Sequence, residues 1–127
     1  MRNALRFALG RLASLEYQRA FGVGATKDEL VLFYELLDSA TNKAEVTLAQ
    51  PILSRGYTSA ELCALREFVQ VANEAAEPIP MGSLSWADLI ATSEWNAIRL
   101  AAQRTLDALG LNVTLQELIA HDNKGFE

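Results

Sequence analysis

Apolar residues recur at helical spacing along most of the chain. Over residues 2–13 a single face collects the apolar side chains Leu5, Ala8, Leu9 and Leu12, whereas the arginines of this segment fall mostly elsewhere. The pattern predicts an amphipathic first helix with its apolar side turned toward a core. Residues 15–18 either extend this helix or form a further turn, and Gly22 and Gly24 are expected to end it.

Helix starts are marked by a recurring polar sequence. Thr-x-x-Glu occurs from Thr26, Thr58 and Thr114, and a similar Ser-x-x-Asp occurs from Ser85. In such a capping box the hydroxyl accepts the backbone amide three residues on, and the carboxylate accepts the amide of the capping residue. We therefore expect a helix after Thr26 and after Thr58, a closing turn after Thr114, and a short turn from Ser85 that reaches Ile90.

Proline and glycine indicate where these helices end. The helix after Thr26 should run to about Ala40, and a shorter helix should occupy roughly 42–53, with a ragged end because Pro51 removes a backbone donor. The helix after Thr58 should stop before Pro78. A last long helix is predicted over about 93–109, with Gly110 just past its end.

The sequence thus predicts an all-α, single-domain bundle over residues 1–127, with about four main helices and two or three short ones. No segment alternates apolar and polar residues for long, and no tight hairpin turn separates β-branched runs. Residues 121–127 are expected to form a frayed tail. The aromatic residues Trp86, Trp95, Phe33, Tyr34 and Phe68 are expected to pack in the core.

Composition narrows the functional classes. The 127 residues are 50% hydrophobic and 21% charged, with a formal net charge of −5, which suits one compact domain. No apolar run approaches the ~18 residues of a membrane span, and no signal peptide is evident. A cytoplasmic location without membrane contact is expected. Direct binding to nucleic acid is disfavoured, because phosphate contacts need lysine and arginine.

No motif indicates catalysis, a metal or a cofactor. Gly22-Val23-Gly24-Ala25-Thr26-Lys27 resembles a phosphate loop only superficially, because a helix precedes it and Asp28 follows the lysine. Cys63 and His121 are the only residues of their types, so neither a zinc site nor a thiol–imidazole pair is expected. Cys63 should pack as a small hydrophobe beside Leu62 and Leu65. We expect a protein that is not an enzyme and needs no cofactor.

Carboxylates occur in pairs at helical spacing. Glu35 with Asp38, and Glu74 with Glu77, each share one helix face and in principle suit a divalent cation or acid–base chemistry. A di-metal bundle would supply a Glu-x-x-His motif from each of two helices, and the chain has none. Solvated acidic faces are the simpler interpretation.

Charge is distributed unevenly along the chain. Residues 1–24 hold four arginines and one glutamate, for a net charge of +3; residues 25–45 hold two lysines and five carboxylates, for −3; residues 58–94 hold one arginine and six carboxylates, for −5. A basic first helix beside two acidic ones would give a dipolar surface that attracts a basic partner. The alternative is that the acidic residues only keep the protein soluble.

Three stretches resemble a family of small helical bacterial proteins. They are Leu9-x-x-Leu12-Ala13-x-x-x-Tyr17-Gln18, then Leu32-Phe33-Tyr34-Glu35-Leu36-Leu37-Asp38, and Ser93-Glu94-Trp95-Asn96 leading into Ala101-Ala102 and Leu106. The order of these features resembles immunity proteins of contact-dependent growth inhibition and related polymorphic toxin systems. Asn96 stands where such proteins favour proline, and the acidic cluster after Phe33 is sparser than theirs.

The resemblance implies a non-enzymatic inhibitor that binds a cognate bacterial toxin domain, a nuclease by expectation, and covers its active site. A basic nuclease would suit an acidic inhibitor, so Glu35, Asp38 and Glu45 are the expected toxin-binding residues. The same helical pattern also fits a non-catalytic adaptor or regulatory subunit. A third interpretation is an enzyme of unfamiliar type.

Overall fold

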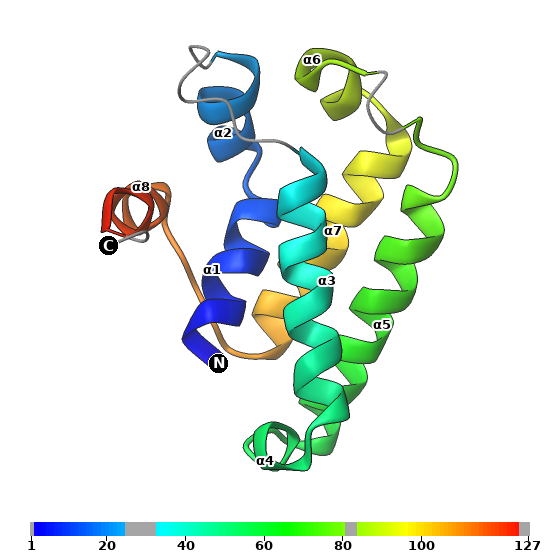
Figure 1. Cartoon of the computed structure of the whole chain (residues 1–127), viewed down its shortest axis with the longest axis vertical. Helices are drawn as coiled ribbons and strands as arrows, with labels where there is room; N and C mark the ends of the chain where they lie inside the picture. Colours follow the sequence, from blue (N-terminus) through cyan, green and yellow to red (C-terminus); the bar gives the residue numbers. More distant parts are fainter. Residues whose placement is uncertain (1, 25–32, 81–83, 125–127) are drawn as a thin grey trace.

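A computed structural model describes residues 2–24, 33–80 and 84–124 of the chain. These residues are largely helical and contain no strand (Figure 1), so the predicted all-α class is confirmed. The elements in order are α1 (Arg2–Ala13), α2 (Leu15–Gln18), the π-helical turn η1 (Arg19–Val23), α3 (Phe33–Ala49), α4 (Pro51–Ser54), α5 (Ser59–Ala76), α6 (Trp86–Ile90), α7 (Ser93–Ala108) and α8 (Leu115–Lys124).

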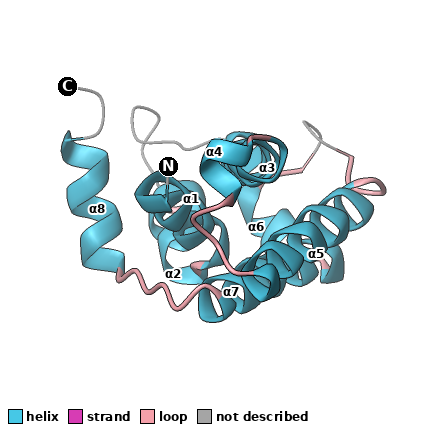
Figure 2. Ribbon diagram, turned by 90° about the horizontal axis from the view of Figure 1, so that it is seen from below, coloured by secondary structure: helices cyan, strands magenta, loops and turns pink. Residues whose placement is uncertain are grey.

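The four long helices α1, α3, α5 and α7 form the bundle. Helix α7 packs against α5 and α1, and α3 packs against the same two helices from the other side. The end-on view in Figure 2 shows α8 set apart from this bundle, beyond α1. A second, smaller apolar cluster lies apart from the main core. It consists of Phe7 of α1, Tyr17 of α2 and Leu118 of α8.

The apolar faces predicted from the sequence meet in the main core. Fully buried side chains from all four long helices meet there, among them Leu5, Leu9, Leu12, Ala40, Ala44, Leu65, Phe68, Trp95 and Ile98. Phe33, Trp86 and Trp95 pack edge to face on one another, with ring centroids 5.7–6.2 Å apart. The prediction that Tyr34 joins them is wrong: it lies one position round the helix and is 43% exposed.

Helix α3 is longer than the sequence pattern suggested. It runs without a break through Ala40 to Ala49, so the predicted end near Ala40 and the separate helix over 42–53 are wrong. Ala40 and Ala44, four residues apart, are both fully buried against the core and hold the helix there. Pro51 instead starts α4 as its first residue, where the missing N–H leaves no bond unmade.

The predicted helix ends are mostly confirmed. Thr58 and Thr114 form reciprocal capping boxes with the glutamates three residues on, and Ser85 accepts the Asp88 amide. Gly110 follows α7 with φ 65°, and the Leu111 amide returns to the Leu106 carbonyl at 2.9 Å, as in a Schellman end. The capping box predicted at Thr26 lies outside the described residues.

Candidate partner-binding surface

The outer face of α3 is an exposed surface that carries several carboxylates. The helix buries one side, and its opposite side presents Tyr34, Glu35, Asp38, Asn42, Glu45, Val46 and Ala49 to solvent. At 3.6 residues per turn these positions fall on a single arc of the helix. Folding therefore brings the three predicted residues Glu35, Asp38 and Glu45 onto one exposed face.

These three carboxylates have no cationic partner within the residues that the structure describes. Glu35, Asp38 and Glu45 are exposed, and no ion pair or side-chain hydrogen bond involves their carboxyl groups. An ionised carboxylate is an acceptor only, and a guanidinium or ammonium group is its strongest partner. The surface is thus chemically suited to a basic protein surface.

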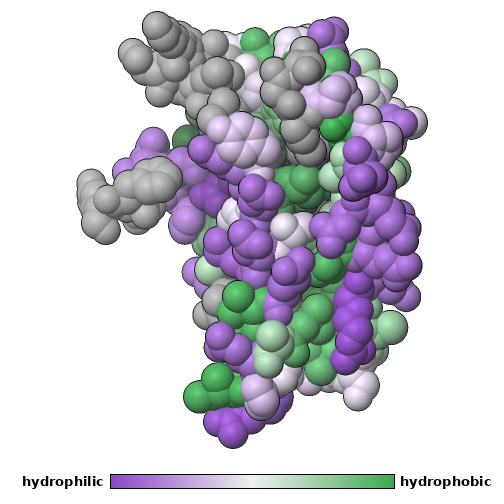
Figure 3. All heavy atoms as spheres, turned by 45° about the vertical axis from the view of Figure 1, so that its right-hand side comes forward, coloured by the Kyte–Doolittle hydropathy of each residue, from purple (hydrophilic) through white to green (hydrophobic). Residues whose placement is uncertain are grey.

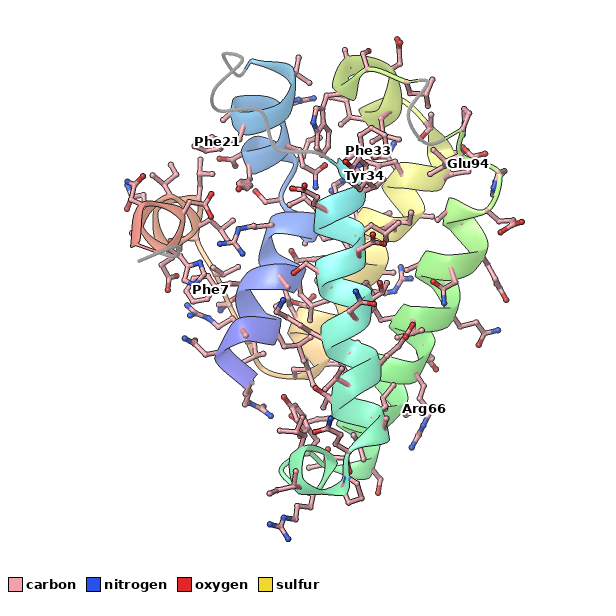
Figure 4. All side chains as sticks on the ribbon, viewed as in Figure 1. Phe7, Phe21, Phe33, Tyr34, Arg66 and Glu94 are labelled. Carbon is pink, nitrogen blue, oxygen red and sulfur yellow. The ribbon has the colours of Figure 1, made fainter. Side chains whose placement is uncertain are left out.

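Apolar side chains lie at both ends of this acidic row. Tyr34 stands beside Phe33 at the first turn of α3 (Figure 4) and is 43% exposed. Val46 at the other end is 36% exposed, and Ile52 on α4 is 68% exposed. Figure 3 shows hydrophilic residues gathered over the face that α3 and α5 form, with apolar ones between them. Exposed aromatic side chains such as Tyr34 are enriched at protein interfaces.

The basic first helix does not form the free positive surface that its charge suggested. Three of the four arginines of residues 1–24 are paired inside the molecule: Arg2 with Glu61, Arg6 with Glu117, and Arg11 with Asp122. Arg2 also donates to the Leu109 carbonyl at 3.0 Å. These arginines tie α1 to the start of α5 and to α8, so their charge is largely compensated locally.

The pKa values of the two paired glutamates, Glu61 and Glu117, are lowered, and the largest cause is the hydrogen bond from a helix cap. The pKa of Glu61 is lowered by the Thr58 backbone amide and then by Arg2. The pKa of Glu117 is lowered in the same way by the Thr114 amide and then by Arg6. Each carboxylate therefore serves both a capping box and an ion pair.

The prediction of a frayed tail from His121 is wrong for residues 121–124, which belong to α8. Asp122 accepts the Tyr17 hydroxyl at 2.6 Å and two N–H groups of Arg11 at 2.6 and 3.0 Å. Figure 4 shows Phe7 between α1 and α8, where its ring stacks on His121 with centroids 4.0 Å apart. Burial and then the bond to Asp122 raise the pKa of Tyr17. Residues 125–127 lie outside the described part.

The other candidate chemical groups are not assembled into a site. Cys63 is exposed, so the expectation that it packs as a hydrophobe is wrong; its Sγ lies 3.9 Å from a Glu67 oxygen. Glu74 and Glu77 are both exposed. Gly22 is buried, and a Cβ there would lie 2.5 Å from Trp86 Cδ2, which explains glycine by close packing. Within the described ranges, no three His, Cys, Asp or Glu residues are grouped to hold a metal ion.

Sequence reasoning missed the apolar part of the surface. The sequence pattern places Tyr34 in the core and marks neither Val46 nor Ile52 as a surface residue. Counting 100° per residue from the buried Phe33 and Leu37 would have placed Val46 opposite the core, but Ile52 follows a change of helix direction at Gln50.

No family model, curated protein or solved structure matches the chain. No helix in the described ranges is long and apolar enough to cross a membrane.

Proposed function

We propose that this chain is a cytoplasmic immunity protein that binds a cognate bacterial toxin domain and neutralises it by covering its active site. The toxin is a basic nuclease, and the inhibitor itself catalyses nothing. Glu35, Asp38 and Glu45 on α3 contact the toxin. The sequence resemblance in the first, third and seventh helices supports this proposal.

One structural observation carries the choice of surface. The three carboxylates of α3 share one exposed face and have no ionic partner in the described chain, whereas Glu61, Glu117 and Asp122 are paired with arginines. A basic partner can therefore contact these three carboxylates without first breaking an ion pair of the described chain. Glu61, Glu117 and Asp122 would first have to leave their arginines.

The physical gain from such a surface is in both rate and affinity. Long-range attraction between opposite charges speeds docking, and close charge pairs at an interface couple by ~1.5–7 kcal/mol. Tyr34 and Val46 add apolar area at the two ends of the row. Because a nuclease must itself attract phosphate, an acidic inhibitor surface competes for the same basic residues.

The proposal is tested by co-expression with the neighbouring gene product. The C-terminal domain encoded by the reading frame immediately upstream is induced in a bacterium with and without this chain, and survivors are counted. We expect rescue of growth and a stable complex on purification. The triple variant Glu35→Lys/Asp38→Lys/Glu45→Lys should bind at least about a hundredfold more weakly, because three attractive pairs become repulsive.

The matched control reverses three exposed carboxylates elsewhere. Glu74→Lys/Glu77→Lys/Asp107→Lys changes the net charge by the same amount on α5, its end and α7, and should still rescue growth. Circular dichroism and thermal melting establish that both triple variants fold. Unchanged affinity of the α3 variant would remove this surface, and toxicity without rescue by the natural chain would remove the immunity function for that pair. A harmless neighbour would favour the adaptor.

A further inference from the structure

A second surface lies between α5 and α7. The two helices leave a hollow of about 270 Å³ whose lining includes Ala64, Val71, Ala101 and Ala108. No α3 residue lines it, so it is separate from the acidic face. Small residues on both helices allow another helix to approach closely.

The α5 side and the α7 side of this hollow carry opposite charges. Glu67 on α5 and Arg104 on α7 both line it and are both exposed. They form no ion pair with each other, and neither is paired with any other charged residue in the part of the chain that the structure describes. Leu100, one turn before Arg104 on α7, is 48% exposed. The surface thus combines a hollow, a protruding leucine, one positive charge and one negative charge.

We propose that a second copy of the chain docks on this surface, related to the first by a two-fold axis. A two-fold contact brings the same patch of both copies together, so it must complement itself. Here Glu67 of each copy faces Arg104 of the other, and Leu100 of each copy packs on the small residues of the other. A strongly basic or acidic partner would leave one of the two charges opposed, whereas a second copy satisfies both.

This pairing has a consequence for the α3 surface. Because the contact is confined to α5 and α7, the acidic face of each copy stays open in the dimer. The inference does not depend on the identity of any toxin.

The test is a charge swap followed by mass measurement. Sedimentation velocity of the full-length chain over a wide concentration range should show a reversible monomer–dimer equilibrium. Glu67→Arg alone and Arg104→Glu alone should each weaken dimerisation by at least about tenfold, because each puts like charges opposite one another. The double variant Glu67→Arg/Arg104→Glu should restore the dimer, and Leu100→Ser should weaken it.

Glu74→Arg is the matched control, because it reverses an exposed α5 carboxylate that does not line the hollow. It should dimerise like the natural chain. Melting curves show whether each variant is folded. A natural chain that stays monomeric at all concentrations overturns the proposal. So does a dimer that both single reversals leave intact, or a double variant no better than the single ones.

Discussion

Acidic side chains have two different fates in this protein. On α8 and at the start of α5, Glu117, Asp122 and Glu61 are each held by an arginine of α1. On α3, Glu35, Asp38 and Glu45 face solvent without an ion pair in the described structure. The comparison shows that the net charge of a sequence segment does not reveal which charged side chains are free to bind a partner. Ion pairs between residues far apart in the chain neutralise some of them.

The largest expected difference is between the stability changes caused by removing a paired aspartate, Asp122, and an exposed one, Asp38. Asp122→Ala leaves the Tyr17 hydroxyl and the Arg11 guanidinium without their shared acceptor, so it should lower the free energy of unfolding by about 1–3 kcal/mol. Asp38→Ala should change it by less than about 0.5 kcal/mol, because this exposed carboxylate forms no ion pair within the described residues. Urea unfolding measures both. A loss for Asp122→Ala no larger than that for Asp38→Ala would mean that the Asp122 contacts with Arg11 and Tyr17 do not stabilise the fold.

A smaller difference is expected between two tyrosines. Tyr17 donates to Asp122, whereas the buried Tyr57 hydroxyl donates to no acceptor within the described residues. Tyr17→Phe should cost about 0.5–1.5 kcal/mol, and Tyr57→Phe should be neutral or slightly stabilising. Thermal unfolding of the two variants gives the comparison. A Tyr57→Phe loss as large as that of Tyr17→Phe would show that the Tyr57 hydroxyl is bonded in solution.

The hydrogen bond between Tyr17 and Asp122 also predicts how the free energy of unfolding changes at alkaline pH. The folded-state pKa of Tyr17 is raised above its ordinary value near 10. Its contribution is therefore fully present below about pH 10 and is lost as the pH rises beyond that value. Stability of the natural chain should fall more steeply above pH 10 than that of Tyr17→Phe.

The smallest expected effect is on the acid side. The folded-state pKa values of Glu61 and Glu117 are lowered, so the stability that they supply is present above their ordinary pKa and is lost as the pH falls through the lowered one. Glu117→Gln should melt at a lower temperature than the natural chain at pH 7, and the gap should narrow toward acid pH. Glu45→Gln is the control and should show no such gap, because Glu45 caps no helix start and forms no ion pair within the described residues. Melting temperatures from pH 7 down to pH 2 test this.

Local sequence signals predicted the helix ends well. Thr58, Ser85, Thr114 and Gly110 act within a few residues of the helix that each one bounds, so their effect is visible in the sequence. The boundary predicted at Ala40 failed because no local signal distinguishes a continuous helix from two. The burial of Ala40 and Ala44 against other helices decided it.

The candidate surface was predicted in part. Periodicity alone places Glu35, Asp38 and Glu45 away from Phe33 and Leu37, and the structure agrees. The exposure of Tyr34 was not foreseen, because it adjoins the apolar arc and only the neighbouring elements determine whether that edge is covered. Whether this surface binds a toxin stays a prediction.

The sequence by itself determined the helical class, most helix limits and the apolar faces, because these depend on spacing and on capping within one turn. Only the tertiary structure decided which charges remain free. Arg6 and Glu117 are 111 residues apart, as are Arg11 and Asp122, and no local pattern joins them. Folding packs α8 onto α1, pairs those charges and leaves the carboxylates of α3 facing solvent.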